Sequence, residues 1–200
     1  MQKTTYLISQ LRKSNVGKEV SKRMVEFSMV PRDFNSLFRE LVFCILTAGT
    51  SADLGLRTIN HLGNTIFTGN EKQIQKKLKE VYRFHTVRAK YIYDARSKFR
   101  NINIKSPNIR EVLVDKIKGL GMKEASHFLR NVGFKNYAII DFHIVDFLVK
   151  NRMIEKPKAI TPKKYLEIEK ILSKLAKKTN TNLGELDLYL WYLETGKILK

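Results

Sequence analysis

Two glycines one residue apart interrupt residues 116–134, whose sequence is KIKGLGMKEASHFLRNVGF. Because the flanking segments have helical character, the pair predicts a very tight hairpin between two helices. Without side chains the backbone can approach another molecule closely, and a turn that leads into a helix directs free amides toward an anion such as a phosphate. Gly119, Gly121 and the adjacent Lys118 are therefore candidate phosphate contacts, which would position a duplex rather than distinguish its sequence. An ordinary helix-helix turn is the alternative.

The charge of the chain favours a polyanionic partner. Its 200 residues include 38 Lys and Arg against 19 Asp and Glu, a formal net charge of +19, with a pI near 10.0. A field of this sign attracts nucleic acid and speeds its capture. A lysine-rich solvated surface, or adaptation to heat, is the alternative explanation.

Apolar residues recur at helical spacing from end to end, whereas strand signals are weak, so the fold class is predicted to be all-α. Asp33 caps a predicted central buried helix that extends to Leu46. The chain is long enough for one large core or for two small cores that share a cleft. Other helices are expected over 52–62 after the cap Ser51, 71–81, 87–99, 108–116, 142–151, 161–178 with Thr161 as cap, and 183–195 before a left-handed cap at Gly196.

Cysteine and histidine usage excludes several kinds of site. Cys44 is the only cysteine, so an intramolecular disulfide and a four-thiolate zinc or iron–sulfur site are excluded, and its apolar neighbours predict a buried thiol. The four histidines lack close metal-ligand spacing, and we expect neither a metal nor a cofactor. The N-terminus has no secretory segment and no apolar run approaches a membrane span, which predicts a soluble intracellular protein.

Lys123 lies immediately inside the helix that follows the glycine hairpin. The positive end of the helix dipole and partial burial in a cleft both favour a neutral amine there. Such an amine can attack the anomeric carbon of a nucleotide, displace the base and leave a Schiff base, from which β-elimination breaks the strand. A solvated helix lysine is the alternative.

Asp141 supplies a carboxylate that one helix and a return connection separate from Lys123. It could stabilise the positive charge that develops as a glycosidic bond lengthens, or assist proton transfer. It is also a predicted N-cap, and the two roles are compatible because the cap would fix the carboxylate. Asp146 competes for the role, but its position within the predicted helix favours a solvent-facing side chain.

The segment 117–125, together with Asp141 in 138–143, closely resembles the helix-hairpin-helix DNA glycosylase superfamily that includes endonuclease III. The stretch 43–51 is similar to that superfamily's buried helix and the loop after it. The resemblance places Lys123 where bifunctional members carry their Schiff-base lysine and Asp141 where they carry their catalytic aspartate. Since monofunctional members lack the lysine, the resemblance implies lyase activity.

Without a cysteine quartet, the chain differs from the iron–sulfur branch of that superfamily, and its size and its ending at 191–200 resemble the archaeal (type 2) 8-oxoguanine DNA glycosylase/AP lyases. This resemblance implies that Lys200, through its terminal carboxylate, and Trp191 recognise the oxidised base, with Phe84 as a further stacking candidate. The chain departs from the pattern where Lys118 replaces the usual hairpin proline. It departs again at Gly49, where many relatives have a polar residue that fills the gap left by an extruded base.

These observations predict one glycosylase unit over 1–200, with lobes over 32–131 and over 1–31 plus 132–200 that flank a cleft. The expected activity is excision of 8-oxoguanine from damaged double-stranded DNA, followed by strand cleavage. A monomer in the cytoplasm, associated with the nucleoid and without an obligate protein partner, is expected. A glycosylase for another oxidised base, a non-catalytic helix-hairpin-helix DNA-binding module and, more distantly, a basic RNA-binding protein are the alternatives.

Overall fold

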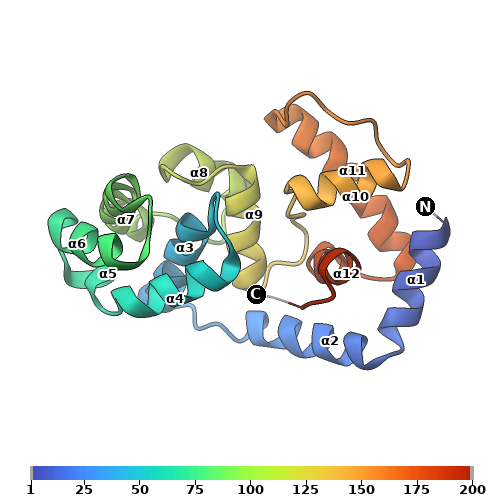
Figure 1. Cartoon of the computed structure of the whole chain (residues 1–200), viewed down its shortest axis with the longest axis horizontal. Coiled ribbons are helices and arrows are strands. Elements are labelled where there is room, and N and C mark those ends of the chain that lie inside the picture. Colours follow the sequence, from blue (N-terminus) through green and yellow to red (C-terminus); the bar gives the residue numbers. More distant parts are fainter. Residues whose placement is uncertain (1, 199–200) are drawn as a thin grey trace. The chain divides into compact units, whose positions relative to one another are not determined.

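Residues 2–198 are described by a computed structural model, and within this range every regular element is a helix (Figure 1). The predicted all-α class is therefore confirmed. No helix in the same range is both long enough and apolar enough to cross a bilayer. In chain order the helices are α1 (Gln2–Arg12), α2 (Asn15–Ser28), α3 (Phe34–Thr47), α4 (Ala52–Leu62), α5 (Thr65–Thr68), α6 (Glu71–Val81), α7 (His85–Arg100), α8 (Ile109–Lys116), α9 (Met122–Asn131), α10 (Phe142–Lys150), α11 (Pro162–Thr179) and α12 (Leu183–Thr195).

Side chains at the predicted caps start the helices as expected. Asp33 Oδ1 accepts a hydrogen bond from the Ser36 amide at 3.0 Å, and this bond, with the one from the Ser36 hydroxyl, lowers the pKa of Asp33. Ser51 accepts from the Leu54 amide at 3.2 Å. At the other end of the chain, Gly196 has φ +70° and closes α12 in the left-handed conformation. The caps therefore fix where these helices begin and end.

Two compact units divide the chain, one formed by 30–128 and the other by 1–29 together with 129–200. The division falls between Phe128 and Leu129, so α9 contributes residues to both units. Each unit has its own apolar interior.

Helix α3 is the centre of the unit 30–128, where α4, α5 and α7 pack against it (Figure 1). From Glu40 to its last residue, Thr47, the helix is buried on all sides, and Cys44 is fully buried, as predicted. The Phe38 ring stacks on Phe34 at 5.2 Å, and Phe128 from α9 meets Phe99 edge-on at 5.7 Å. Each of these large side chains contributes about 1.5–3 kcal/mol on burial, so α3 is a rigid base for the loop that follows it.

The unit 1–29 plus 129–200 is built around α12, which packs against α2, α10 and α11. Arg130, at the end of α9, is 2% exposed, with its guanidinium 4.5 Å from the centre of the Phe27 ring and 3.5 Å from Asp187 Oδ2 on α12. A buried guanidinium is costly unless it is paired, and here a carboxylate and an aromatic face compensate for the lost water.

Candidate active site

The predicted hairpin is present between α8 and α9. Helix α8 ends when the Ile117 amide donates to Leu113 O at 2.9 Å, and the Leu120 amide then donates to Ile117 O at 3.2 Å. Gly119 has φ +91°, a conformation that side chains other than glycine rarely adopt. The Ala125 amide donates to Gly121 O at 2.9 Å and so begins α9. Lys118 is exposed at the turn.

The hairpin amide of Gly121 already has an internal partner, because it donates to Glu124 Oε2 at 3.2 Å. The same carboxylate lies 3.6 Å, through Oε1, from the Lys123 Nζ atom. A phosphate that used the Gly121 amide would therefore have to displace Glu124. Glu124 was visible in the hairpin sequence, but sequence reasoning did not single it out.

Lys123 is the second residue of α9, and its side chain is 26% exposed. The four residues after Glu124 are buried, so the backbone that carries Lys123 is firmly held. Lys123 thus has a backbone held in place and an accessible side-chain amine. These are requirements for a nucleophile that must meet one carbon atom of a bound substrate.

Asp141 is the N-cap of α10, and its Oδ1 atom accepts a hydrogen bond from the Ile144 amide at 2.9 Å. Its predicted capping role is confirmed. The competing Asp146 is exposed and lies 3.6 Å from the Lys156 ammonium, as expected for a solvent-facing side chain.

Two side chains of α11 hold the extended segment that leads into Asp141. The Tyr165 hydroxyl donates to Ala138 O at 2.6 Å and accepts from the Ile140 amide at 3.1 Å. Glu169 Oε2 accepts from the Ala138 amide at 2.9 Å. With Tyr165 only 2% exposed, these bonds replace water at backbone groups that lack a helical partner. The backbone before Asp141 is therefore fixed, although no sequence pattern pointed to Tyr165 or Glu169.

An aromatic group follows Asp141. The Phe142 ring is 67% exposed and lies 3.9 Å from the His143 ring, which in turn meets Trp191 edge-on at 5.0 Å. Trp191 Nε1 is buried and has no hydrogen-bond partner within residues 2–198. Trp191 is therefore placed in the same unit as Asp141, whereas Lys200, the other predicted base-recognition residue of that region, lies outside the described residues.

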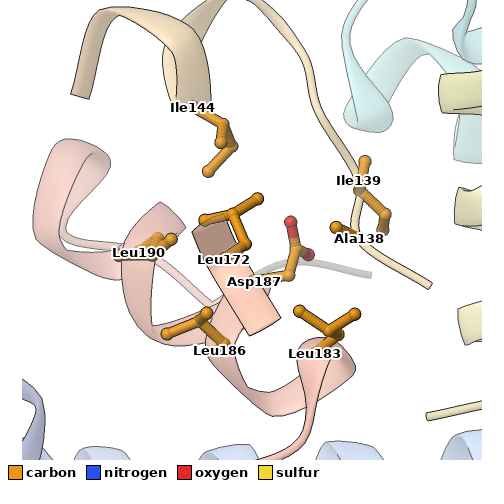
Figure 2. A pocket seen from close by; sticks show the side chains of 8 residues that line it. All are labelled: Ala138, Ile139, Ile144, Leu172, Leu183, Leu186, Asp187 and Leu190. Atoms are coloured by element: carbon orange, nitrogen blue, oxygen red, sulfur yellow. The ribbon is translucent and has the colours of Figure 1, made fainter. Parts of the chain in front are cut away.

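An apolar pocket borders the Asp141 segment (Figure 2). Ala138 and Ile139 contribute to one side and α12 to another, and Asp187 is the only charged side chain among the lining residues. The Asp187 carboxylate is the partner of the buried Arg130. Neither Asp141 nor Trp191 lines this pocket, which is formed within the unit 1–29 plus 129–200.

Phe84, the remaining candidate, lies in the other unit, at the start of α7. Its ring is 40% exposed, with the Arg83 guanidinium 4.4 Å from its centre and Tyr82 edge-on at 6.1 Å. The hairpin residues and Phe84 thus belong to 30–128, while Asp141 and Trp191 belong to the second unit. Within residues 2–198 no group of three or more His, Cys, Asp or Glu side chains could hold a metal ion.

The helical fold of residues 2–198, the glycine hairpin and the lysine at the start of the following helix fit the class of helix-hairpin-helix DNA glycosylases. The model of the 8-oxoguanine DNA glycosylase family (Ogg-HhH) matches residues 20–181, and the chain belongs to this family.

The similar proteins match this chain over nearly their whole lengths. The chain is 48% identical to the 8-oxoguanine DNA glycosylase/AP lyase of Korarchaeum cryptofilum, over 96% of each chain. It matches the crystal structure of the Methanocaldococcus jannaschii 8-oxoguanine glycosylase/lyase in complex with a 15mer DNA containing 8-oxoguanine, with a TM-score of 0.93 at 43% identity, over 98% of this chain and 99% of that one. The 8-oxoguanine DNA glycosylase of Thermotoga maritima gives a TM-score of 0.92 at 35% identity, over 100% and 99% of the two chains.

Proposed function

We propose that this chain removes 8-oxoguanine from double-stranded DNA and then cleaves the strand, as a DNA glycosylase with AP lyase activity. The observation that carries the proposal is Lys123, the second residue of α9, directly after the hairpin glycines in a chain of the 8-oxoguanine DNA glycosylase family. The names of its relatives and the DNA bound to one of them support the same activity.

Lys123 is the proposed nucleophile. The neutral Nζ atom bonds to C1′ of the damaged nucleotide as the bond from C1′ to the base breaks, and the proton lost from Nζ balances the one gained by the departing base. Opening of the C1′–O4′ bond gives the Schiff base, with a proton on O4′. Loss of a C2′ proton then expels the 3′ phosphate by breaking the C3′–O3′ bond, and hydrolysis of the imine frees the lysine.

Asp141 is the proposed stabiliser of the positive charge on the sugar as the base departs. Its N-cap bond to Ile144, and the bonds of Tyr165 and Glu169 to the preceding backbone, support this role because they fix the carboxylate before substrate binds. A fixed charge needs little reorganisation during the reaction.

The remaining predicted residues have proposed roles in binding. Lys118 and the amides of Gly119 and Gly121 hold a DNA phosphate, and a phosphate that displaced Glu124 would also release Lys123 from it. Trp191, Phe84 and Lys200 contact the flipped base or its surroundings. We also propose that the chain works as a monomeric single unit, without an obligate protein partner, on DNA in the cytoplasm.

Borohydride trapping tests the assignment. The wild-type protein, incubated with a duplex containing 8-oxoguanine, should form a reduced covalent adduct with DNA, and Lys123→Gln should abolish it. The matched control is Lys116→Gln, which removes an exposed lysine at the end of α8 and should leave the adduct intact.

An adduct that persists in Lys123→Gln would refute the assigned nucleophile. If the wild-type protein binds the duplex but never forms an adduct, the chain is a non-catalytic DNA-binding module, and Lys123→Gln should then only weaken binding and its dependence on salt. A panel of duplexes with other oxidised bases would show whether 8-oxoguanine is the preferred lesion.

A further inference from the structure

One face of α7 carries Phe84, Arg88 and Tyr91, spaced four and three residues apart, as neighbours along one side of a helix are. Arg88 and Tyr91 are both half-buried, and the Arg88 guanidinium lies 5.7 Å from the centre of the Tyr91 ring. Cations within about 6 Å of an aromatic face are attracted to it. The two side chains therefore restrain each other.

The Tyr91 ring occupies the place of a side chain on the hairpin glycine. A Cβ atom added to Gly119 would lie 2.5 Å from Tyr91 Cδ2, 3.2 Å from Cε2 and 3.3 Å from Cγ. All three of these nearest atoms belong to Tyr91, so the ring lies against the side of Gly119 where a Cβ atom would be. The positive φ of Gly119 and the presence of Tyr91 both require that this position lacks a side chain.

Arg88, the second member of the Arg88–Tyr91 pair, holds the loop between α3 and α4. Arg88 donates to Ala48 O at 2.7 Å, and Arg83 donates to Gly49 O at 3.2 Å. Gly49 has φ +76° and nothing within 4 Å of a Cβ atom placed on it, so these two guanidinium groups hold carbonyls of a loop whose tip lacks packing. A continuous set of contacts thus joins Ala48, Arg88, Tyr91 and Gly119 within the unit 30–128.

We propose that Arg88 and Tyr91 are positioning residues for the DNA-binding hairpin. Tyr91 packs against Gly119 and holds it in the position that meets a phosphate. Arg88, through its bond to Ala48, fixes the Tyr91 ring. The inference rests on the proposed function, because it assigns the hairpin a DNA phosphate. Neither side chain needs to touch the substrate.

Binding to a duplex with a tetrahydrofuran abasic analogue, followed by fluorescence anisotropy at several salt concentrations, tests the proposal. Tyr91→Ala should bind about tenfold more weakly. The slope of log K against log salt should become smaller in magnitude, by the amount that corresponds to about one phosphate contact. Tyr91→Phe, which keeps the ring, should restore wild-type binding. Tyr93→Ala is the matched control, since Tyr93 is an exposed tyrosine of the same helix with the Arg96 guanidinium 5.5 Å from its ring, and it should bind as the wild type does.

Equal binding by Tyr91→Ala and Tyr93→Ala would overturn the inference. So would a loss in Tyr91→Phe as large as in Tyr91→Ala, because the hydroxyl and not the ring would then be responsible. Should Tyr91→Ala fail to fold, Arg88→Lys tests the same contacts with the ring present: several-fold weaker binding is expected, and wild-type binding would refute the role. Borohydride trapping of the wild-type protein separates the two hypotheses. A wild-type protein that binds the duplex without forming an adduct contradicts only the glycosylase/lyase proposal, whereas the comparison of Tyr91→Ala with Tyr93→Ala still tests the positioning role.

Discussion

Replacement of Gly119 by alanine should lower the free energy of unfolding by about 2–5 kcal/mol, whereas the same change at Gly121 should alter it by less than about 1 kcal/mol. At Gly119 a side chain at φ +91° costs roughly 1–2 kcal/mol in backbone strain. The new methyl group would also lie 2.5 Å from Tyr91 Cδ2, and overpacking of this kind costs roughly 1–3 kcal/mol. At Gly121 the nearest atom is Glu124 Oε2 at 3.2 Å, the mobile end of a side chain that can move aside.

Urea unfolding of the two variants beside the wild type measures the difference, provided that the slopes of the transitions agree. Gly119→Ala should also bind the abasic-analogue duplex more weakly at temperatures where it is fully folded, because the hairpin must shift to relieve the contact. Equal stability of Gly119→Ala and Gly121→Ala would refute the reasoning. The double variant Gly119→Ala with Tyr91→Ala separates the two contributions. If adding Tyr91→Ala does not restore part of the free energy of unfolding lost in Gly119→Ala, the steric contribution is absent and only backbone strain remains.

Tyr165→Phe should slow single-turnover excision of 8-oxoguanine while KM changes little, since it removes both hydroxyl bonds that fix the backbone before Asp141. Unfolding measurements should show a cost of about 1–3 kcal/mol for the buried groups left unpaired. Glu124→Gln should bind duplex DNA about two- to fivefold more tightly at low salt, and the gain should fade as salt rises, because a negative charge is removed beside the phosphate site. Glu111→Gln, on the exposed surface of α8, should show no such gain. An equal gain in affinity from both changes would contradict the explanation that the charge of Glu124 acts locally on the phosphate site.

Most of the helices could be predicted because their signals are local. Apolar spacing and caps located α3, α4, α6 and α12, and the bounds of α4, α6 and α12 were predicted to the residue. Helix α7 begins at His85, two residues before its predicted start, no bounds were predicted for α1 and α2, and the four-residue α5 was not predicted. The two residues missed at the start of α7, His85 and Thr86, are polar and add nothing to the apolar pattern, and α5 is too short to show a period.

The candidate site could be predicted only in part. Lys123 and Asp141 were identified by their places in a local motif and by resemblance. Tyr165 and Tyr91 were not, because each acts on a backbone segment more than twenty residues away in sequence, and an isolated tyrosine carries no sign of its partner. Glu124 lies within the motif segment 117–125, yet the bond from the Gly121 amide depends on the precise start of α9.

The division of the chain also bears on the order in which it folds during synthesis. Residues 30–128 are one continuous stretch, so this unit is complete as soon as that stretch has left the ribosome. Helix α2 packs against α1 and also against α12, so the unit that contains it is complete only after α12 has been made, and Arg12 waits likewise for the Thr179 carbonyl, 2.9 Å away in the finished protein. The unit 30–128 can thus fold while α1 and α2 still lack their contacts with α11 and α12.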